Sequence, residues 1–160
     1  MVSATVRLEA TRARVRRCTS RSRLVGIPRT RSYRVLVDTI ETTHAPHPIG
    51  PYSQAVRVGD FLFCSGQVGL DPGTGKLVSG GVKAEAERIM ENVRELLSAA
   101  GVNLEHVVKT TIFLADMADF SDVNTVYGGY FSGSYPARTT VAVAALPAGA
   151  SVEIDVIARM

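Results

Sequence analysis

The spacing of apolar residues predicts two helices in the second half of the chain. Apolar side chains recur at steps of three and four from position 82 to position 100, and Gly101 follows as a C-terminal cap. The opposite side of this helix is expected to face solvent, since it carries Glu85, Glu87, Glu91, Arg94 and Glu95. A second helix is predicted over residues 118–131, with one apolar side formed by Phe120, Val123, Val126 or Tyr127, and Tyr130.

Short runs of β-branched and apolar residues predict five strands around these helices. They cover residues 54–58, 61–65, 106–115, 138–145 and 152–158, and Gly59-Asp60 is expected to close a hairpin between the first two. The order β-β-α-β-α-β-β predicts an α+β domain, a mixed sheet with both helices packed on one face. The other face also needs cover, which favours self-association; the candidate residues are Ala142, Ala144, Val152 and Ile154.

Charge divides the chain near residue 38. Residues 1–37 hold ten arginines and one acid, a net charge of +9, whereas residues 38–160 hold eight basic and fourteen acidic residues, a net charge of −6. We therefore expect a disordered Arg-rich leader over 1–37 and one folded domain over 38–160. Two interpretations of the leader stay open: an organelle transit peptide, or the translation of a start codon assigned too far upstream.

Cysteine usage and hydropathy indicate the compartment. The chain has two cysteines, Cys18 and Cys64, too few for a disulfide framework, which favours a reducing environment. Cys64 ends an apolar run and is expected to be a buried, inert thiol. No apolar run approaches the roughly 18 residues that span a bilayer, so no membrane association is predicted. The expected location is the cytoplasm, or the mitochondrial matrix or plastid stroma if the leader is a transit peptide.

Motifs of common cofactor and metal enzymes are missing from the sequence. It contains no P-loop, no dinucleotide-binding glycine fingerprint and no Gly-x-Ser-x-Gly elbow. His44 and His47 lie in a proline-rich loop without further metal-binding partners, so no metal site is predicted. Any chemistry therefore rests on Arg, Glu, Tyr, Ser, Thr and Asn side chains.

Two charged residues have more than one interpretation. Arg138 opens an apolar strand and is the only basic residue between Lys109 and Arg159. It fits either a surface arginine at a strand end or a guanidinium that captures a carboxylate through two hydrogen bonds. Glu153 alternates with apolar residues, so it lies on the exposed face of a strand or, if that face is covered, acts on water or on a proton.

Six separated motifs together resemble the RidA family of enamine and imine deaminases, over residues from about 40 to 160. They are Ile-Gly-Pro-Tyr-Ser-Gln-Ala at 49–55, Ser-Gly-Gln at 65–67, Val-Lys-Thr-Thr at 108–111, Asp-Phe-Ser-Asp-Val-Asn-Thr-Val-Tyr at 119–127, Pro-Ala-Arg at 136–138 and Val-Glu-Ile-Asp at 152–155. The resemblance implies a chorismate-mutase-like fold and a homotrimer with ligand sites between subunits. It also implies cofactor-free hydrolysis of 2-imino acids and enamines, such as 2-aminoacrylate, to 2-keto acids and ammonia, which protects pyridoxal-phosphate enzymes from damage.

The resemblance further implies roles for individual residues. Arg138 would bind the substrate carboxylate, while Glu153 would hold the attacking water and assist proton transfer. The substrate-binding residues would be Arg138, Tyr52, Ser65, Gly66, Asn124 and Thr140, the last of which stands where some members have Cys.

Two other functions stay open at this point. One is a non-catalytic regulator that binds small carboxylates in the same cleft. The other is an RNA-directed ribonuclease or translation inhibitor, against which the net charge of −6 over residues 38–160 argues, because nucleic-acid binding draws most of its affinity from basic surface.

Overall fold

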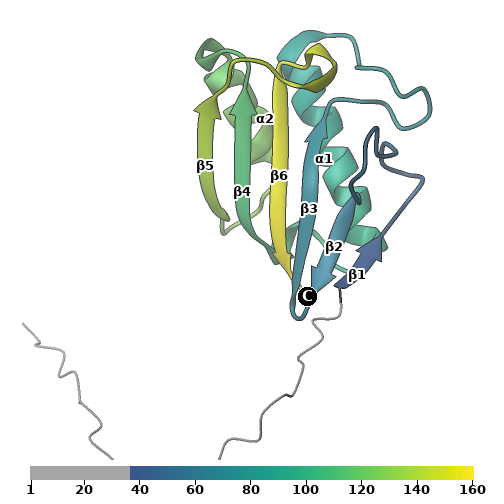
Figure 1. Ribbon diagram of the computed structural model, residues 1–160. Helices are drawn as coiled ribbons and strands as arrows, with labels where there is room; N and C mark the ends of the chain where they lie inside the picture. The colour runs from purple at the N-terminus through teal and green to yellow at the C-terminus, as the bar shows by residue number, and fades with distance from the viewer. Residues whose placement is uncertain (1–36) are drawn as a thin grey trace, which may run out of the picture. The chain divides into compact units, whose positions relative to one another are not determined.

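The computed structural model describes residues 37–160, in which six strands form one mixed sheet beside two helices (Figure 1). The strand order is β1-β2-β3-β6-β4-β5, and within these residues only β4 and β5 pair in parallel. The strands are β1 (Val37–Ile40), β2 (Ala55–Val58), β3 (Phe61–Val68), β4 (Val107–Leu114), β5 (Ala137–Ala142) and β6 (Val152–Arg159). The helices are α1 (Gly81–Ala99) and α2 (Phe120–Gly129), with short 3-10 turns η1 (Leu104–His106), η2 (Met117–Asp119) and η3 (Pro147–Gly149). The predicted leader lies outside the described residues, except for Val37.

Both helices cover the same face of the sheet, as the sequence pattern predicts (Figure 1). Val152, Ile154 and Val156 of β6 belong to the core on that face, and Glu153 and Asp155 alternate onto the other face. The apolar side of α1 is fully buried at Ile89, Met90, Val93, Leu96 and Leu97. Burial of apolar surface contributes about 25 cal/mol per Å² removed from water, so this layer stabilises the fold.

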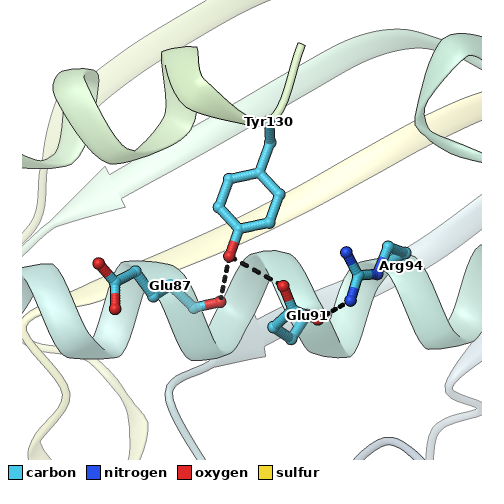
Figure 2. Close-up of polar contacts among 4 residues, drawn as sticks. All are labelled: Glu87, Glu91, Arg94 and Tyr130. Carbon is cyan, nitrogen blue, oxygen red and sulfur yellow. Dashed lines mark hydrogen bonds and ion pairs between the residues drawn. The ribbon is translucent and has the colours of Figure 1, made fainter.

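Tyr130 ties the C-terminal end of α2 to α1 (Figure 2). Its hydroxyl lies 3.0 Å from Glu91 Oε1 and 3.3 Å from the carbonyl oxygen of Glu87, and Glu91 also pairs with Arg94. Burial, together with the acceptor carboxylate of Glu91, raises the pKa of Tyr130 to about 12, so the hydroxyl keeps the proton that it donates. These contacts of Tyr130 fix the C-terminal end of α2 relative to α1.

The structure differs from the predicted pattern at β1 and at several element ends. The sequence pattern predicts no strand over residues 37–40, because so short a segment shows no clear period; its pairing with β2 makes it a strand. β3 continues to Val68, and β5 ends at Ala142 instead of residue 145. His106, predicted to open a strand, ends η1, where its ring lies 2.8 Å from Asn103 Oδ1.

Two predictions about solvent exposure are wrong. The sequence pattern offers Val152 and Ile154 as cover for the second face, but both are fully buried under the helices because their alternation places them there. Ala142 and Ala144 are exposed. The helix pattern also assigns Glu85 to solvent, yet Glu85 is only 6% exposed. Its carboxylate accepts hydrogen bonds from Ser151 N at 2.7 Å and Ser151 Oγ at 3.0 Å, donors that helical spacing cannot show.

Three features of the described residues bear on the class of protein. No helix within residues 37–160 is long and apolar enough to cross a membrane. In the same range, no three His, Cys, Asp or Glu side chains are grouped so that they could hold a metal ion. Cys64 is buried, as predicted, and desolvation raises the pKa of its thiol to about 12, which disfavours the reactive thiolate.

Candidate active site

A cavity of about 280 Å³ lies where the 46–54 segment meets β3 and β6. Four residues predicted for the site line it: Tyr52, Ser65, Gly66 and Glu153. Much of the remaining wall is apolar and is formed by Pro46, Ile49, Val68, Leu70 and Pro147. This recess, called the Glu153 cavity below, has the size and the mixed lining of a small-molecule site.

A β-bulge in β3 brings Gly66 against Glu153. The register between β3 and β6 shifts between Cys64 and Gln67, which leaves Ser65 and Gly66 outside the regular pairing. A Cβ atom on Gly66 would lie 1.9 Å from Glu153 Oε1. Any side chain at position 66 would displace the carboxylate, so the close approach of strand and carboxylate requires glycine.

The surroundings of Glu153 favour its protonated form. Burial raises the pKa of this carboxyl group, and the negative charge of Asp155 on the same face raises it further. Asp155 is itself held by Thr111 N, which donates to Oδ1 at 3.2 Å. A carboxyl group with a raised pKa exchanges protons closer to neutral pH than an ordinary glutamate, as a general acid or base must.

Backbone contacts orient the two hydroxyl groups of the cavity. Ser65 Oγ donates to the carbonyl oxygen of Ser53 at 2.6 Å. Tyr52 Oη accepts a hydrogen bond from Ile49 N at 3.2 Å. Backbone groups of the 49–53 segment therefore hold both hydroxyl groups. Ser65 is held through its hydroxyl proton, and Tyr52 through a lone pair of its oxygen.

Gln54 anchors the outer wall of the cavity, a role that the sequence pattern does not predict. Gln54 is only 2% exposed. Its Nε2 donates to the carbonyl oxygens of Thr42, Ala45 and Pro46 at 3.0, 3.2 and 2.8 Å, and its Oε1 accepts from Thr42 N at 2.7 Å. A proline-rich loop leaves many backbone carbonyl groups without hydrogen-bond partners, and a neighbouring Gln is a possible donor. The sequence alone does not show which carbonyl groups this Gln binds.

Arg138 lies in a different recess of about 430 Å³ beside α2, called the Arg138 pocket below. Its Nη2 donates to Asn124 Oδ1 at 2.8 Å, the only hydrogen bond of this guanidinium within residues 37–160. The guanidinium carbon lies 5.0 Å from the ring centre of Tyr127 and 5.8 Å from that of Phe120. Thr140 follows on the same face of β5. Because the guanidinium lies over aromatic rings and makes one hydrogen bond, to Asn124, its other N–H groups are available to a ligand.

Tyr127 provides an uncharged ring beneath Arg138. Its hydroxyl donates to Thr110 Oγ1 at 3.1 Å in the core. Burial raises the pKa of Tyr127, although the Thr110 hydrogen bond and the Arg138 charge oppose the change. The hydroxyl group therefore keeps its proton and the side chain stays uncharged. The π face of the ring supports the guanidinium without neutralising its positive charge.

The Arg138 pocket and the Glu153 cavity face opposite sides of the sheet. Arg138 pairs with Thr110, whose side chain is buried under the helices, whereas Glu153 pairs with Phe113 on the other face. β4 also separates the two strands that carry them. Within one copy of the chain, Arg138 and Glu153 cannot contact one small ligand together. The residues predicted for one site thus form two groups.

The fold and the two recesses define a small α+β ligand-binding protein, with a guanidinium in one recess and a carboxyl group in the other. The chain belongs to the RidA family. The family model described as Endoribonuclease L-PSP matches residues 42–160. This match confirms the family that the six sequence motifs indicate.

Relatives and solved structures match nearly their whole length to this chain. A mouse protein named 2-iminobutanoate/2-iminopropanoate deaminase is 55% identical over 124 residues, covering 78% of this chain and 92% of that protein. The crystal structure of RidA from an Antarctic Psychrobacter bacterium has a TM-score of 0.75 and 46% identity, covering 77% of this chain and 99% of its own. Escherichia coli TdcF with bound serine has a TM-score of 0.74 and 39% identity, covering 77% and 98%. These neighbours confirm the predicted fold.

Proposed function

We propose that this protein hydrolyses reactive 2-imino acids and their enamine tautomers to 2-keto acids and ammonia. The Arg138 guanidinium is the observation that carries the proposal, because it lies in an open recess whose described lining residues include no acid. An unneutralised guanidinium of this kind binds a carboxylate. The mouse relative, whose name states this activity, supports the same substrate class.

The chemistry needs few protein groups. Water adds to the imine carbon, the C–N bond then breaks, and one imino acid and one water give one keto acid and one ammonia. A protonated imine is already electrophilic, so the water needs positioning more than activation. Glu153, with its raised pKa, would accept a proton from the water and return it to the departing nitrogen. The reaction requires no cofactor or metal.

Each active site would form between two copies of the chain in a homotrimer. Arg138, Asn124 and Thr140 of one copy would meet Tyr52, Ser65, Gly66 and Glu153 of the next. The placement of these groups on opposite faces supports this assembly, because one copy cannot combine them. Large apolar side chains on the face opposite the helices support it as well: Phe61, Phe63 and Val141 are 44%, 42% and 40% exposed.

The activity can be tested with the full-length protein. It should speed the release of ammonia and keto acid from 2-aminoacrylate generated in the assay. Arg138→Ala should lower kcat/KM by about a hundredfold, since the substrate loses its positioning group. Arg159→Ala, which removes an exposed arginine elsewhere in the domain, should match wild type. An unchanged rate in Arg138→Ala would contradict the role of this residue.

Binding without catalysis is the second candidate function. The serine bound to TdcF shows that a relative takes up a small amino acid. A regulator of this type would bind such ligands saturably and leave 2-aminoacrylate untouched in the same assay. Salt-sensitive binding of RNA would instead favour the activity in the family description, despite the net charge of −6 over residues 38–160.

The proposed reaction would protect pyridoxal-phosphate enzymes by removing imino acids before they react. The cytoplasm is the proposed location, with an organelle matrix or stroma as the alternative if residues 1–37 form a transit peptide. N-terminal sequencing of the natural protein tests the leader, because a mature chain that starts at Met1 would contradict both a transit peptide and a start codon assigned too far upstream.

A further inference from the structure

The direction of one hydrogen bond limits what Ser65 can offer a ligand. The carbonyl oxygen of Ser53 cannot donate, so the 2.6 Å contact uses the hydroxyl proton of Ser65. Ser65 Oγ has no other hydrogen-bond partner within residues 37–160, and the residue lines the Glu153 cavity. Ser65 therefore presents lone pairs to the cavity and no proton.

Tyr52 has the opposite polarity in the same cavity. Its oxygen accepts from Ile49 N, so its hydroxyl proton is free to point to a ligand. The two hydroxyl groups thus divide the cavity into an acceptor at Ser65 and a donor at Tyr52. A ligand with an N–H group and a carboxylate complements this arrangement in one orientation only.

We propose that Ser65 Oγ accepts a hydrogen bond from the substrate nitrogen and thereby selects imino acids over their keto products. This inference rests on the proposed function. The N–H of a protonated imine can donate to a lone pair of Ser65 Oγ. The carbonyl oxygen of the keto acid has only lone pairs, so it would be repelled by Ser65 Oγ. Ser65 can donate to that oxygen only after breaking its bond to Ser53, so the cavity holds the substrate and releases the product.

The proposal can be tested with two ligands that share a carboxylate and a side chain and differ at C2. 2-Aminobutanoate carries an ammonium group where 2-ketobutanoate carries a carbonyl oxygen, and both have the same carboxylate and side chain. Calorimetry on the full-length protein gives the ratio of their dissociation constants. Because a hydrogen bond to a charged donor contributes about 1.5–3 kcal/mol, Ser65→Ala should shift the ratio against the amine by roughly ten- to a hundredfold.

Tyr52→Phe is the matched control, since it removes a hydroxyl group of the opposite polarity from the same cavity. It should weaken both ligands alike, because Tyr52 would contact the carboxylate that they share. Ser65→Cys nearly keeps the size of the side chain but has a weakly accepting sulfur, and it should shift the ratio in the same direction even if Ser65→Ala folds poorly.

The ratio separates the proposed role from a structural one and from the proposed function. If Ser65 only supports the 49–53 segment, Ser65→Ala would weaken both ligands equally, and the proposal would be wrong. If Ser65→Ala shifts the ratio but the wild-type protein does not hydrolyse imines, the deaminase function would be overturned. The acceptor role of Ser65 would still stand.

Discussion

Two neighbours shape the surroundings of Glu153, Gly66 on β3 and Asp155 on its own strand β6. Gly66 allows the carboxylate to lie against the bulge of β3, and Asp155 adds a negative charge on the same face. The alternation along β6 predicts which side Glu153 faces. It does not predict the bulge, because Ser65 and Gly66 have no periodic signature, and it therefore gives no measure of how closely the carboxylate is packed.

Glu153→Gln should make the stability of the protein less dependent on pH. Below its unfolded-state pKa the side chain is protonated in both states, so its burial carries no charge. As the pH rises through the raised folded-state pKa, wild type must bury a carboxylate and loses stability, whereas the neutral amide does not. Thermal unfolding at about pH 4 and about pH 8 should therefore show a higher melting temperature for Glu153→Gln than for wild type only at the higher pH. A similar gain in Glu105→Gln would contradict the assignment to Glu153.

Helices and strands with a strong apolar period can be predicted from the sequence, whereas features that depend on contacts between distant segments cannot. The apolar stripe of α1 and the alternation of β4 and β6 predicted these elements to within a few residues. The sequence pattern does not predict β1, because this strand depends on pairing with β2. The helix pattern predicts an exposed Glu85, because a pattern on one helix cannot show that Ser151, 66 residues later, supplies two donors.

Glu85→Ala should destabilise the domain far more than Glu87→Ala, although the two residues are close together on α1. The alanine would leave the N–H and O–H groups of Ser151 without partners in a partly buried position, which costs about 2–3 kcal/mol. The exposed side chain of Glu87 should contribute less than about 0.5 kcal/mol. Urea unfolding of both variants measures the difference, and equal midpoints would show that the buried contact adds nothing to stability.

At the scale of the whole molecule, the fold separates residues that the sequence motifs combine. The family resemblance assigned Arg138 and Glu153 to one reaction, while the register of β4, β5 and β6 directs them to opposite faces. Motif order along a chain carries no information about the face from which a group acts. In the proposed homotrimer, a second copy that offers its opposite face would resolve the conflict, and the exposed aromatic residues Phe61 and Phe63 would provide apolar surface for such contacts.

If the active sites are shared between copies, as proposed, two variants of low activity should restore each other when they are mixed. Arg138→Ala keeps a native Glu153, and Glu153→Gln keeps a native Arg138. When equal amounts are refolded together and assemble at random in a closed ring, about one interface in four combines both native residues, so about a quarter of wild-type activity should return. Each variant taken through refolding alone should keep its low activity, which for Arg138→Ala is about a hundredth of wild type. If both groups instead act within one chain, no mixed assembly contains a native site, and the mixture would be as inactive as its components.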